Sequence, residues 1–270
     1  MLSGAGGRGD VLALWFVGTF PFALATWRTL HTGVMTLPPI NGPTEGLFIL
    51  MATHVLTFVV GQGAAWGGAP VQLLPPRWRA PPAPRAAAYA AAGVLMSLVD
   101  AVAHVAAVAG HEASSGRPRF AALRHLLPYC ALFGSMTSLS WLSPANVAHT
   151  SPFLLLAAGG FPFALLMGII ILAHLTGERS SLMRSMWLAV APMLPVLLNA
   201  SWPAVVHRLR SGGSAGSTDV LTSAPVSEPL ALAAAAVIGA AMYCRFAAGV
   251  ADEIGALLGI RCFSLARRAA

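Results

Sequence analysis

The residues best suited to chemistry lie in a short polar segment, His31–Gly46, which separates two long apolar runs. Asn41 favours a tight turn there, and Pro43 suits the first position of a helix. Glu45 would then lie near the positive N-terminal end of that helix, where a carboxylate is favoured. An acid beside a membrane helix is costly unless it is solvated or functional. The segment therefore indicates a polar cleft, with simple helix capping by Glu45 as the alternative. It predicts the following substrate-binding residues: His31, Asn41, Thr44 and Glu45.

A second candidate is an acid and a histidine within an apolar stretch. Asp100 precedes His104 by four residues, which places both side chains on one face of a helix. Such a pair could relay protons or hold a metal ion. The alternative is that the two side chains satisfy one another inside a helical bundle.

Arg245 is the third candidate, since it lies within the last apolar run. Its guanidinium could contact a phosphate group and so join the substrate-binding set. It could equally extend to the membrane surface or pair with Asp252. The following tail, 251–270, is predicted to be a basic amphipathic cytoplasmic segment at the membrane surface, separate from a membrane domain over 1–250.

The elements that must position these residues are membrane helices. The 270 residues are 57% apolar and only 9% charged, with a mean hydropathy of +0.73, whereas a soluble domain has about 25% charged residues. The net charge of +7 comes from arginines at the ends of apolar runs, which indicates contact with lipid head groups and no role in nucleic-acid binding. The three cysteines show no metal-binding or disulfide spacing.

The continuous apolar runs predict an all-α fold, a polytopic membrane helical bundle of about seven transmembrane helices. The predicted spans are 11–29, 46–66, 86–109, 121–142, 152–175, 185–205 and 228–250. Pro192, Pro195 and Pro203 should kink or end the sixth span. The distribution of arginines favours a cytoplasmic C-terminus and a cytoplasmic polar segment.

Several stretches carry a family resemblance. Pro21-Phe22 and Ala25–Gly33 match a P-F … A-T-W-x-x-x-H-T-G run, and Leu37–Leu47 gives the most specific match. His174-Leu-Thr176 and Met242–Phe246 match further along the chain. In these stretches the chain resembles the eukaryotic choline/ethanolamine phosphotransferases of the CDP-alcohol phosphatidyltransferase family, from about residue 15 to about residue 265.

The resemblance implies transfer of phosphocholine or phosphoethanolamine from a CDP-alcohol to diacylglycerol, with Mg²⁺ or Mn²⁺ at the site. It also implies an endoplasmic reticulum or Golgi membrane location and a possible homodimer. The family binds its metals through D-x-x-D-G-x-x-A-R and G-x-x-x-D-x-x-x-D, and no Asp of this chain is followed by Gly.

We therefore expect the C-terminal portion of such an enzyme, with no catalytic residue, metal site or cofactor of its own and no activity alone. The seven predicted spans match what remains of a ten-span fold without its first three helices. Two other classes stay open. The chain could be a pseudoenzyme or membrane scaffold, or a proton-coupled transporter that uses Asp100, His104 and Arg245.

Overall fold

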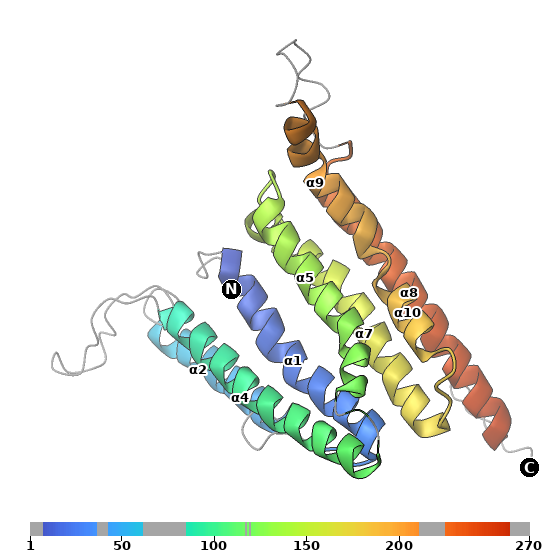
Figure 1. Ribbon diagram of the computed structural model, residues 1–270. Coiled ribbons are helices and arrows are strands. Elements are labelled where there is room, and N and C mark those ends of the chain that lie inside the picture. The colour runs from blue at the N-terminus through green and yellow to red at the C-terminus, as the bar shows by residue number, and fades with distance from the viewer. Residues whose placement is uncertain are drawn as a thin grey trace, which may run out of the picture.

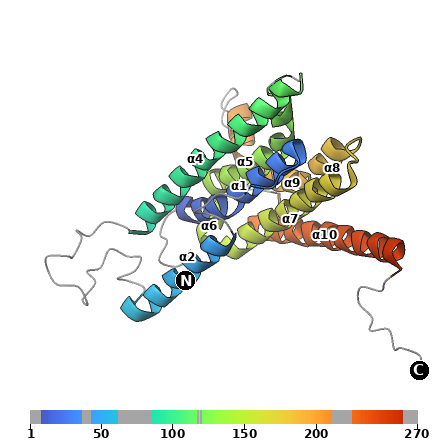
Figure 2. The ribbon, with the colours of Figure 1, turned by 90° about the horizontal axis from the view of Figure 1, so that it is seen from below.

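The computed structural model is helical, with no β-strand in the residues that it describes. These residues are 8–36, 43–61, 85–116, 118, 120–210 and 225–259. Asn41, a predicted site residue, and most of the tail 251–270 lie outside them. Figures 1 and 2 show the helices from two directions.

Each predicted span corresponds to a helix or to a pair of consecutive helices. The elements are α1 (Arg8–Thr32), α2 (Pro43–Val60), α4 (Arg85–Ser114), the 3₁₀ helix η3 (Ala121–Leu126), α5 (Leu127–Leu142), α6 (Val147–Thr150), α7 (Pro152–Thr176), α8 (Leu182–Val190), α9 (Met193–Arg210) and α10 (Glu228–Leu258). Helix α10 continues past residue 250, so the predicted domain boundary does not coincide with a helix end.

The helices make this an integral membrane protein. Within the described residues, three helices are long and apolar enough to cross a bilayer, Ala91–Ser114, Pro152–Thr176 and Glu228–Leu258, and the bent pair α8–α9 gives a fourth if it is one span. The helical membrane fold is therefore confirmed, whereas the count of seven spans stays a prediction.

The predicted kink in the sixth span is confirmed. Helices α8 and α9 meet at an angle of 45°, and Pro192 lies in the two-residue break between them. A proline there cannot donate a backbone hydrogen bond to the preceding turn, which explains the position of the bend.

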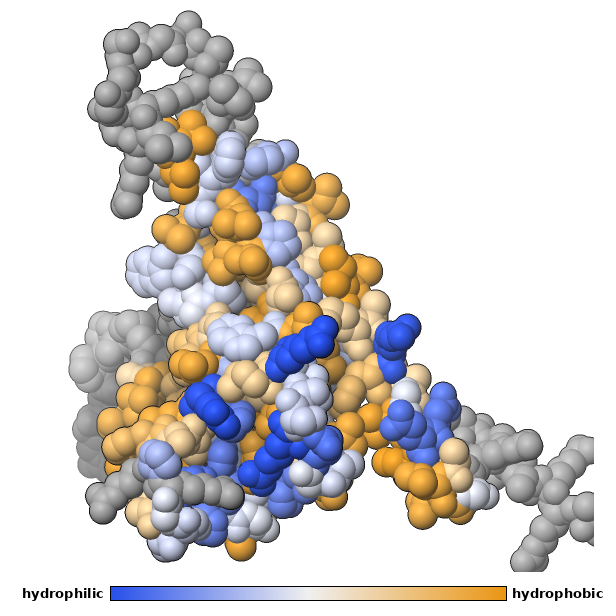
Figure 3. Space-filling view, turned by 45° about the vertical axis from the view of Figure 1, so that its right-hand side comes forward, coloured by the Kyte–Doolittle hydropathy of each residue, from blue (hydrophilic) through white to orange (hydrophobic). Residues whose placement is uncertain are grey.

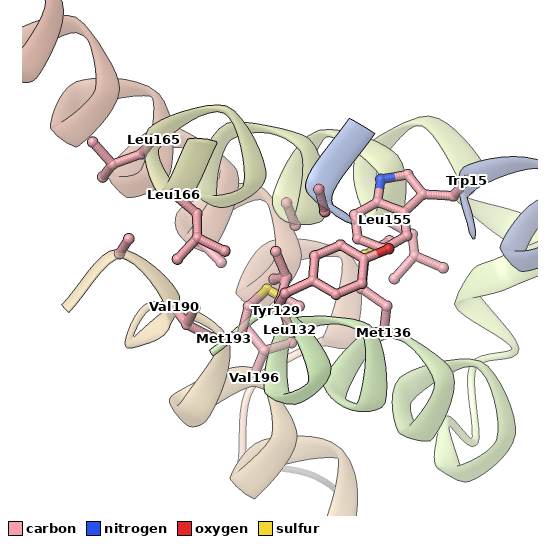
Figure 4. Close-up of a cluster of buried hydrophobic side chains, with 14 of the residues drawn as sticks. Trp15, Tyr129, Leu132, Met136, Leu155, Leu165, Leu166, Val190, Met193 and Val196 are labelled. Carbon is pink, nitrogen blue, oxygen red and sulfur yellow. The ribbon is translucent and has the colours of Figure 1, made fainter. Parts of the chain in front are cut away.

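The apolar core lies where α1 and α5 meet α7 and the α8–α9 pair (Figure 4). Trp15 of α1 stacks on Tyr129 of α5, with ring centroids 6.2 Å apart. Met136 of α5 and Leu166 of α7 are completely buried in the same cluster. Tight helix contacts of this kind hold a bundle together in lipid, where burial of apolar surface between helices gives little driving force.

Glycine allows α7 to approach two neighbours closely. A Cβ atom at Gly159 would overlap the Met136 sulfur, and one at Gly168 would lie 2.7 Å from Phe246 Cε1 of α10. Small residues at such crossings are typical of membrane helix pairs. Helix α7 is therefore the central element on which α5 and α10 pack.

Large apolar side chains cover much of the outer surface, as the orange areas of Figure 3 show. Phe58 of α2, Val102 of α4, Phe153 of α7 and Leu257 of α10 are each at least 70% exposed. In a soluble protein such a surface would cause aggregation, whereas in a bilayer it contacts acyl chains.

Candidate functional site

Helices α1 and α4 end at the same end of the bundle (Figure 1), and ionisable side chains from three elements meet there. His31 lies in the last turn of α1, Glu112 in the last turn of α4, and His125 in η3. We call these three residues the histidine cluster. Gly33 and Gly116, both with positive φ, follow the ends of α1 and α4, so the chain turns away directly beyond the cluster.

An acid–histidine dyad forms the centre of the cluster. His31 Nδ1 lies 3.2 Å from Glu112 Oε1, and the two side chains are only 5% and 3% exposed. The His125 ring lies beside that of His31, with centroids 5.2 Å apart. Burial lowers the pKa of His31 to about 4, His125 acts in the same direction, and Glu112 opposes them. The His31 ring is therefore neutral at pH 7.

Two further side chains fix the dyad in place. Trp27 lies one helical turn before His31, packs against its ring edge-on and donates its indole N–H to the Ala122 carbonyl at 3.0 Å. Arg179, in the connection between α7 and α8, donates to the Leu30 carbonyl at 2.6 Å. Contacts from α4, η3 and the connection between α7 and α8 thus converge on the last turn of α1.

The predicted pair, Asp100 and His104, lies on one face of α4. His104 Nε2 lies 3.4 Å from Asp100 Oδ2, and His104 is 2% exposed. Glu112 follows His104 by eight residues, so it lies on nearly the same face of the helix. The contact agrees with the interpretation that Asp100 and His104 satisfy one another.

Of the other predicted substrate-binding residues, the structure describes the side chain of Arg245 alone. Thr44 and Glu45 lie in the first turn of α2, and Asn41 is outside the described residues. Arg245 is exposed on α10, and no ion pair joins it to Asp252 in the described part of the chain. His31 instead contacts Glu112 and His125, which sequence reasoning missed.

The histidine cluster does not fit a metal ion. No group of three His, Cys, Asp or Glu side chains in the described ranges has a geometry that could hold one. The residues at hand therefore do not fit the Mg²⁺ or Mn²⁺ that the family resemblance implies, and no reaction step is assigned to a metal here.

A second buried carboxylate lies at the opposite end of α5. Glu228, at the start of α10 and 6% exposed, accepts a hydrogen bond from the Ser143 hydroxyl and another from the Ala145 N–H at 3.3 Å. The Ser143 oxygen in turn accepts the Val147 N–H at 3.1 Å. These bonds join the segment after α5 to the start of α10, and we call them the Glu228 bridge.

An apolar groove opens between α1, α7 and α10. Its lining includes Phe22, Phe163, Met167, Tyr243 and Phe246, and its volume is about 550 Å³. The lining offers almost no polar group, so the groove suits a hydrocarbon chain rather than a nucleotide.

Three curated proteins are similar to this chain along nearly its whole length. It is 30% identical over 266 residues, 97% of this chain, to choline/ethanolaminephosphotransferase 1 of Arabidopsis thaliana. It is 28% identical over the same share to choline/ethanolaminephosphotransferase 2 of that plant. It is 24% identical over 274 residues, 96% of this chain, to the uncharacterized CDP-alcohol phosphatidyltransferase class-I family protein 3 of Dictyostelium discoideum.

The chain spans 64% of the length of each of these relatives. No protein-family model matches it. The chain is a homologue of choline/ethanolaminephosphotransferases and of CDP-alcohol phosphatidyltransferase family proteins, which confirms the resemblance found in its sequence motifs.

Proposed function

We propose that this chain acts in phospholipid biosynthesis, in the transfer of phosphocholine or phosphoethanolamine from a CDP-alcohol to diacylglycerol. The observation that carries the proposal is 30% identity over 97% of the chain to a choline/ethanolaminephosphotransferase. The aligned region includes the polar segment His31–Gly46, with the most specific of the sequence motifs.

Within that reaction, the chain supplies the lipid side of the site. The apolar groove lined by Phe22, Met167 and Phe246 suits an acyl chain. The polar segment and Arg245 would contact the head group or diphosphate at the rim. The metal ions would be held by acidic residues of the kind that the family motif provides, and this chain lacks that motif.

The same resemblance supports a location in the endoplasmic reticulum membrane, with the Golgi as the alternative, a cytoplasmic C-terminus and assembly as a homodimer. The Asp100–His104 contact favours a structural pair over a proton relay, so no observation favours the transporter alternative.

Labelling with a photoactivatable diacylglycerol tests the lipid-binding part of the proposal. The purified chain in lipid nanodiscs should be labelled saturably, unlabelled diacylglycerol should compete, and triacylglycerol should not. Labelled peptides should include those of α7 and α10 that line the groove. Labelling that does not saturate would overturn the proposed function.

A turnover assay tests the remaining part. The chain alone, with diacylglycerol, a CDP-alcohol and Mg²⁺ or Mn²⁺, should release no CMP. Co-expression with the segment of the Arabidopsis relative that carries the metal-binding motif should restore release. Metal-dependent turnover by the chain alone would show that it contains a complete active site.

A further inference from the structure

The His31 ring has one buried nitrogen without a partner. Its Nδ1 lies 3.2 Å from Glu112 Oε1, and we assign the ring hydrogen to Nδ1 because an ionised carboxylate only accepts hydrogen bonds. In a neutral imidazole the other nitrogen, Nε2, is then a bare acceptor. His31 Nε2 is buried and has no hydrogen-bond partner among the described residues.

Two donors beside the ring are bonded elsewhere, and two further nitrogens, Arg28 Nε and His125 Nδ1, are buried without a partner among the described residues. The Trp27 indole N–H is bonded to the Ala122 carbonyl at 3.0 Å, and Arg179 Nη2 is bonded to the Leu30 carbonyl at 2.6 Å. A buried acceptor without a donor is unfavourable, because it has lost its hydrogen bond to water. None of these groups is bonded to His31 Nε2, so that atom is open to a donor from outside the described residues.

The charges around the cluster select the kind of donor. Arg179 acts electrostatically on His31 and on His125, and Arg124 acts on His125, so an ammonium group is disfavoured by repulsion. An anion is disfavoured at Nε2 itself, because a nitrogen without a hydrogen offers it no donor. A neutral hydroxyl group carries no charge to be repelled and has a hydrogen to donate to Nε2.

We propose that the Glu112–His31 dyad binds a hydroxyl group of a substrate, with His31 Nε2 as the acceptor. The inference rests on the proposed function, whose substrates carry such a group in two places. One is the free hydroxyl of diacylglycerol, and the other is the ribose of the CDP-alcohol. Both sources would present a neutral hydroxyl donor to an oriented, uncharged histidine. His31 is therefore a binding residue.

The test compares each compound with an analogue that lacks the hydroxyl hydrogen, using the full chain in nanodiscs. In one arm, diacylglycerol and its 3-O-methyl ether compete against the photoactivatable diacylglycerol. In the other arm, the CDP-alcohol and its 2′,3′-di-O-methyl analogue compete in a direct binding assay. The wild-type chain should prefer the hydroxyl compound by about tenfold in one arm, which identifies the source of the hydroxyl.

The variants connect that preference to the dyad. His31→Phe removes the acceptor and retains an aromatic ring against Trp27, and it should abolish the preference. Glu112→Gln should reduce it, because the amide no longer fixes the hydrogen on Nδ1. His149→Phe, at an exposed position of α6, is the matched control and should leave the preference unchanged.

The outcomes separate the two proposals. Diacylglycerol labelling that does not saturate overturns the proposed function. Saturable labelling without a hydroxyl preference in either arm overturns only this inference and indicates that His31 Nε2 binds water. The comparison of analogues needs the wild-type chain alone, so it shows whether a hydroxyl preference exists even if His31→Phe does not fold.

Discussion

The two buried carboxylates, Glu112 and Glu228, lie at opposite ends of the bundle and have different kinds of partner. Glu228 accepts hydrogen bonds from the Ser143 hydroxyl and a backbone N–H of the same loop. Glu112 bonds to His31, a side chain 81 residues away that can titrate. Helix α5 separates the two ends by about 24 Å at 1.5 Å per residue.

The difference shows how the same residue type serves two roles. The Glu228 bridge ties a loop to the start of a helix, and its donors belong to the protein. In the histidine cluster, Glu112 orients a ring whose distal nitrogen has no partner in the described residues. Both ends hold a buried atom without a partner in the described residues, Glu228 Oε1 at one and His31 Nε2 at the other, so the difference lies in the titratable ring that Glu112 orients.

The largest effect on stability should come from breaking the Glu228 bridge. Glu228→Ala leaves the buried Ser143 hydroxyl and the Ala145 N–H without their acceptor. We expect a loss of about 2–4 kcal/mol in the free energy of unfolding, measured by thermal unfolding in nanodiscs. Glu253→Ala, at an exposed position of the same helix, is the control. A similar loss in both variants would contradict a structural role for the bridge.

Acid should destabilise the histidine cluster next most strongly. The pKa of His31 is lowered from 6.5 to about 4 in the folded protein, so the unfolded chain takes up a proton first as the pH falls. The contribution of the neutral His31 ring to the free energy of unfolding is therefore complete above pH 6.5 and is lost as the pH falls towards 4. It amounts to about 3 kcal/mol at most, at about 1.4 kcal/mol for each pKa unit.

Unfolding measured across this pH range checks that expectation. His31→Phe should reduce the slope between pH 6.5 and 4, since one group that takes up a proton on unfolding is gone, while His125, whose pKa burial also lowers, remains. An unchanged slope in this variant would assign the acid sensitivity to other groups and contradict the burial of a neutral His31.

A smaller effect is expected from the pair on α4. Asp100→Asn weakens its contact with His104, and a helical pair four residues apart contributes about 0.5 kcal/mol. Proton flux into liposomes that contain the chain should be the same for the variant and the wild type. Flux that depends on Asp100 would instead support the transporter alternative.

The smallest effect should come from Glu178, an exposed carboxylate in the connection between α7 and α8. The Ser180 backbone N–H donates to Glu178 Oε1 at 2.7 Å, and hydrogen bonding to Ser180 lowers the pKa of Glu178 below 4.5. Any contribution of the ionised Glu178 carboxylate to the free energy of unfolding is therefore complete above pH 4.5 and is lost at lower pH. Glu178→Gln should leave the unfolding temperature at pH 7 nearly unchanged, and a marked drop would show that this connection contributes more than its exposure suggests.

Sequence reasoning found the features that depend on local pattern. Long apolar runs predicted the helices, and Pro192 marked the bend between α8 and α9, because proline acts on its own helix. The spacing of Asp100 and His104 likewise predicted their contact. The seven spans, the endoplasmic reticulum location and the substrate-binding roles of Asn41, Thr44, Glu45 and Arg245 stay predictions.

The histidine cluster could not be found in the same way. His31 was singled out for the polar segment after it, but Glu112 and His125 reach it only because α1, α4 and η3 end at the same place. The available signal was the spacing of Asp100, His104 and Glu112 on one face of α4. That pattern shows a polar face of the helix and does not show which residue meets it.

The central claim is that His31 presents a bare acceptor nitrogen at a substrate site, and nitrogen-15 NMR of histidine-labelled protein in nanodiscs tests it most directly. The account predicts that at pH 7 the His31 ring carries its hydrogen on Nδ1, and that the Nε2 resonance shifts when diacylglycerol or a CDP-alcohol is added. A Glu228→Gln variant should show the same spectrum and the same shift. A hydrogen on Nε2 of His31 in the ligand-free protein would contradict the account.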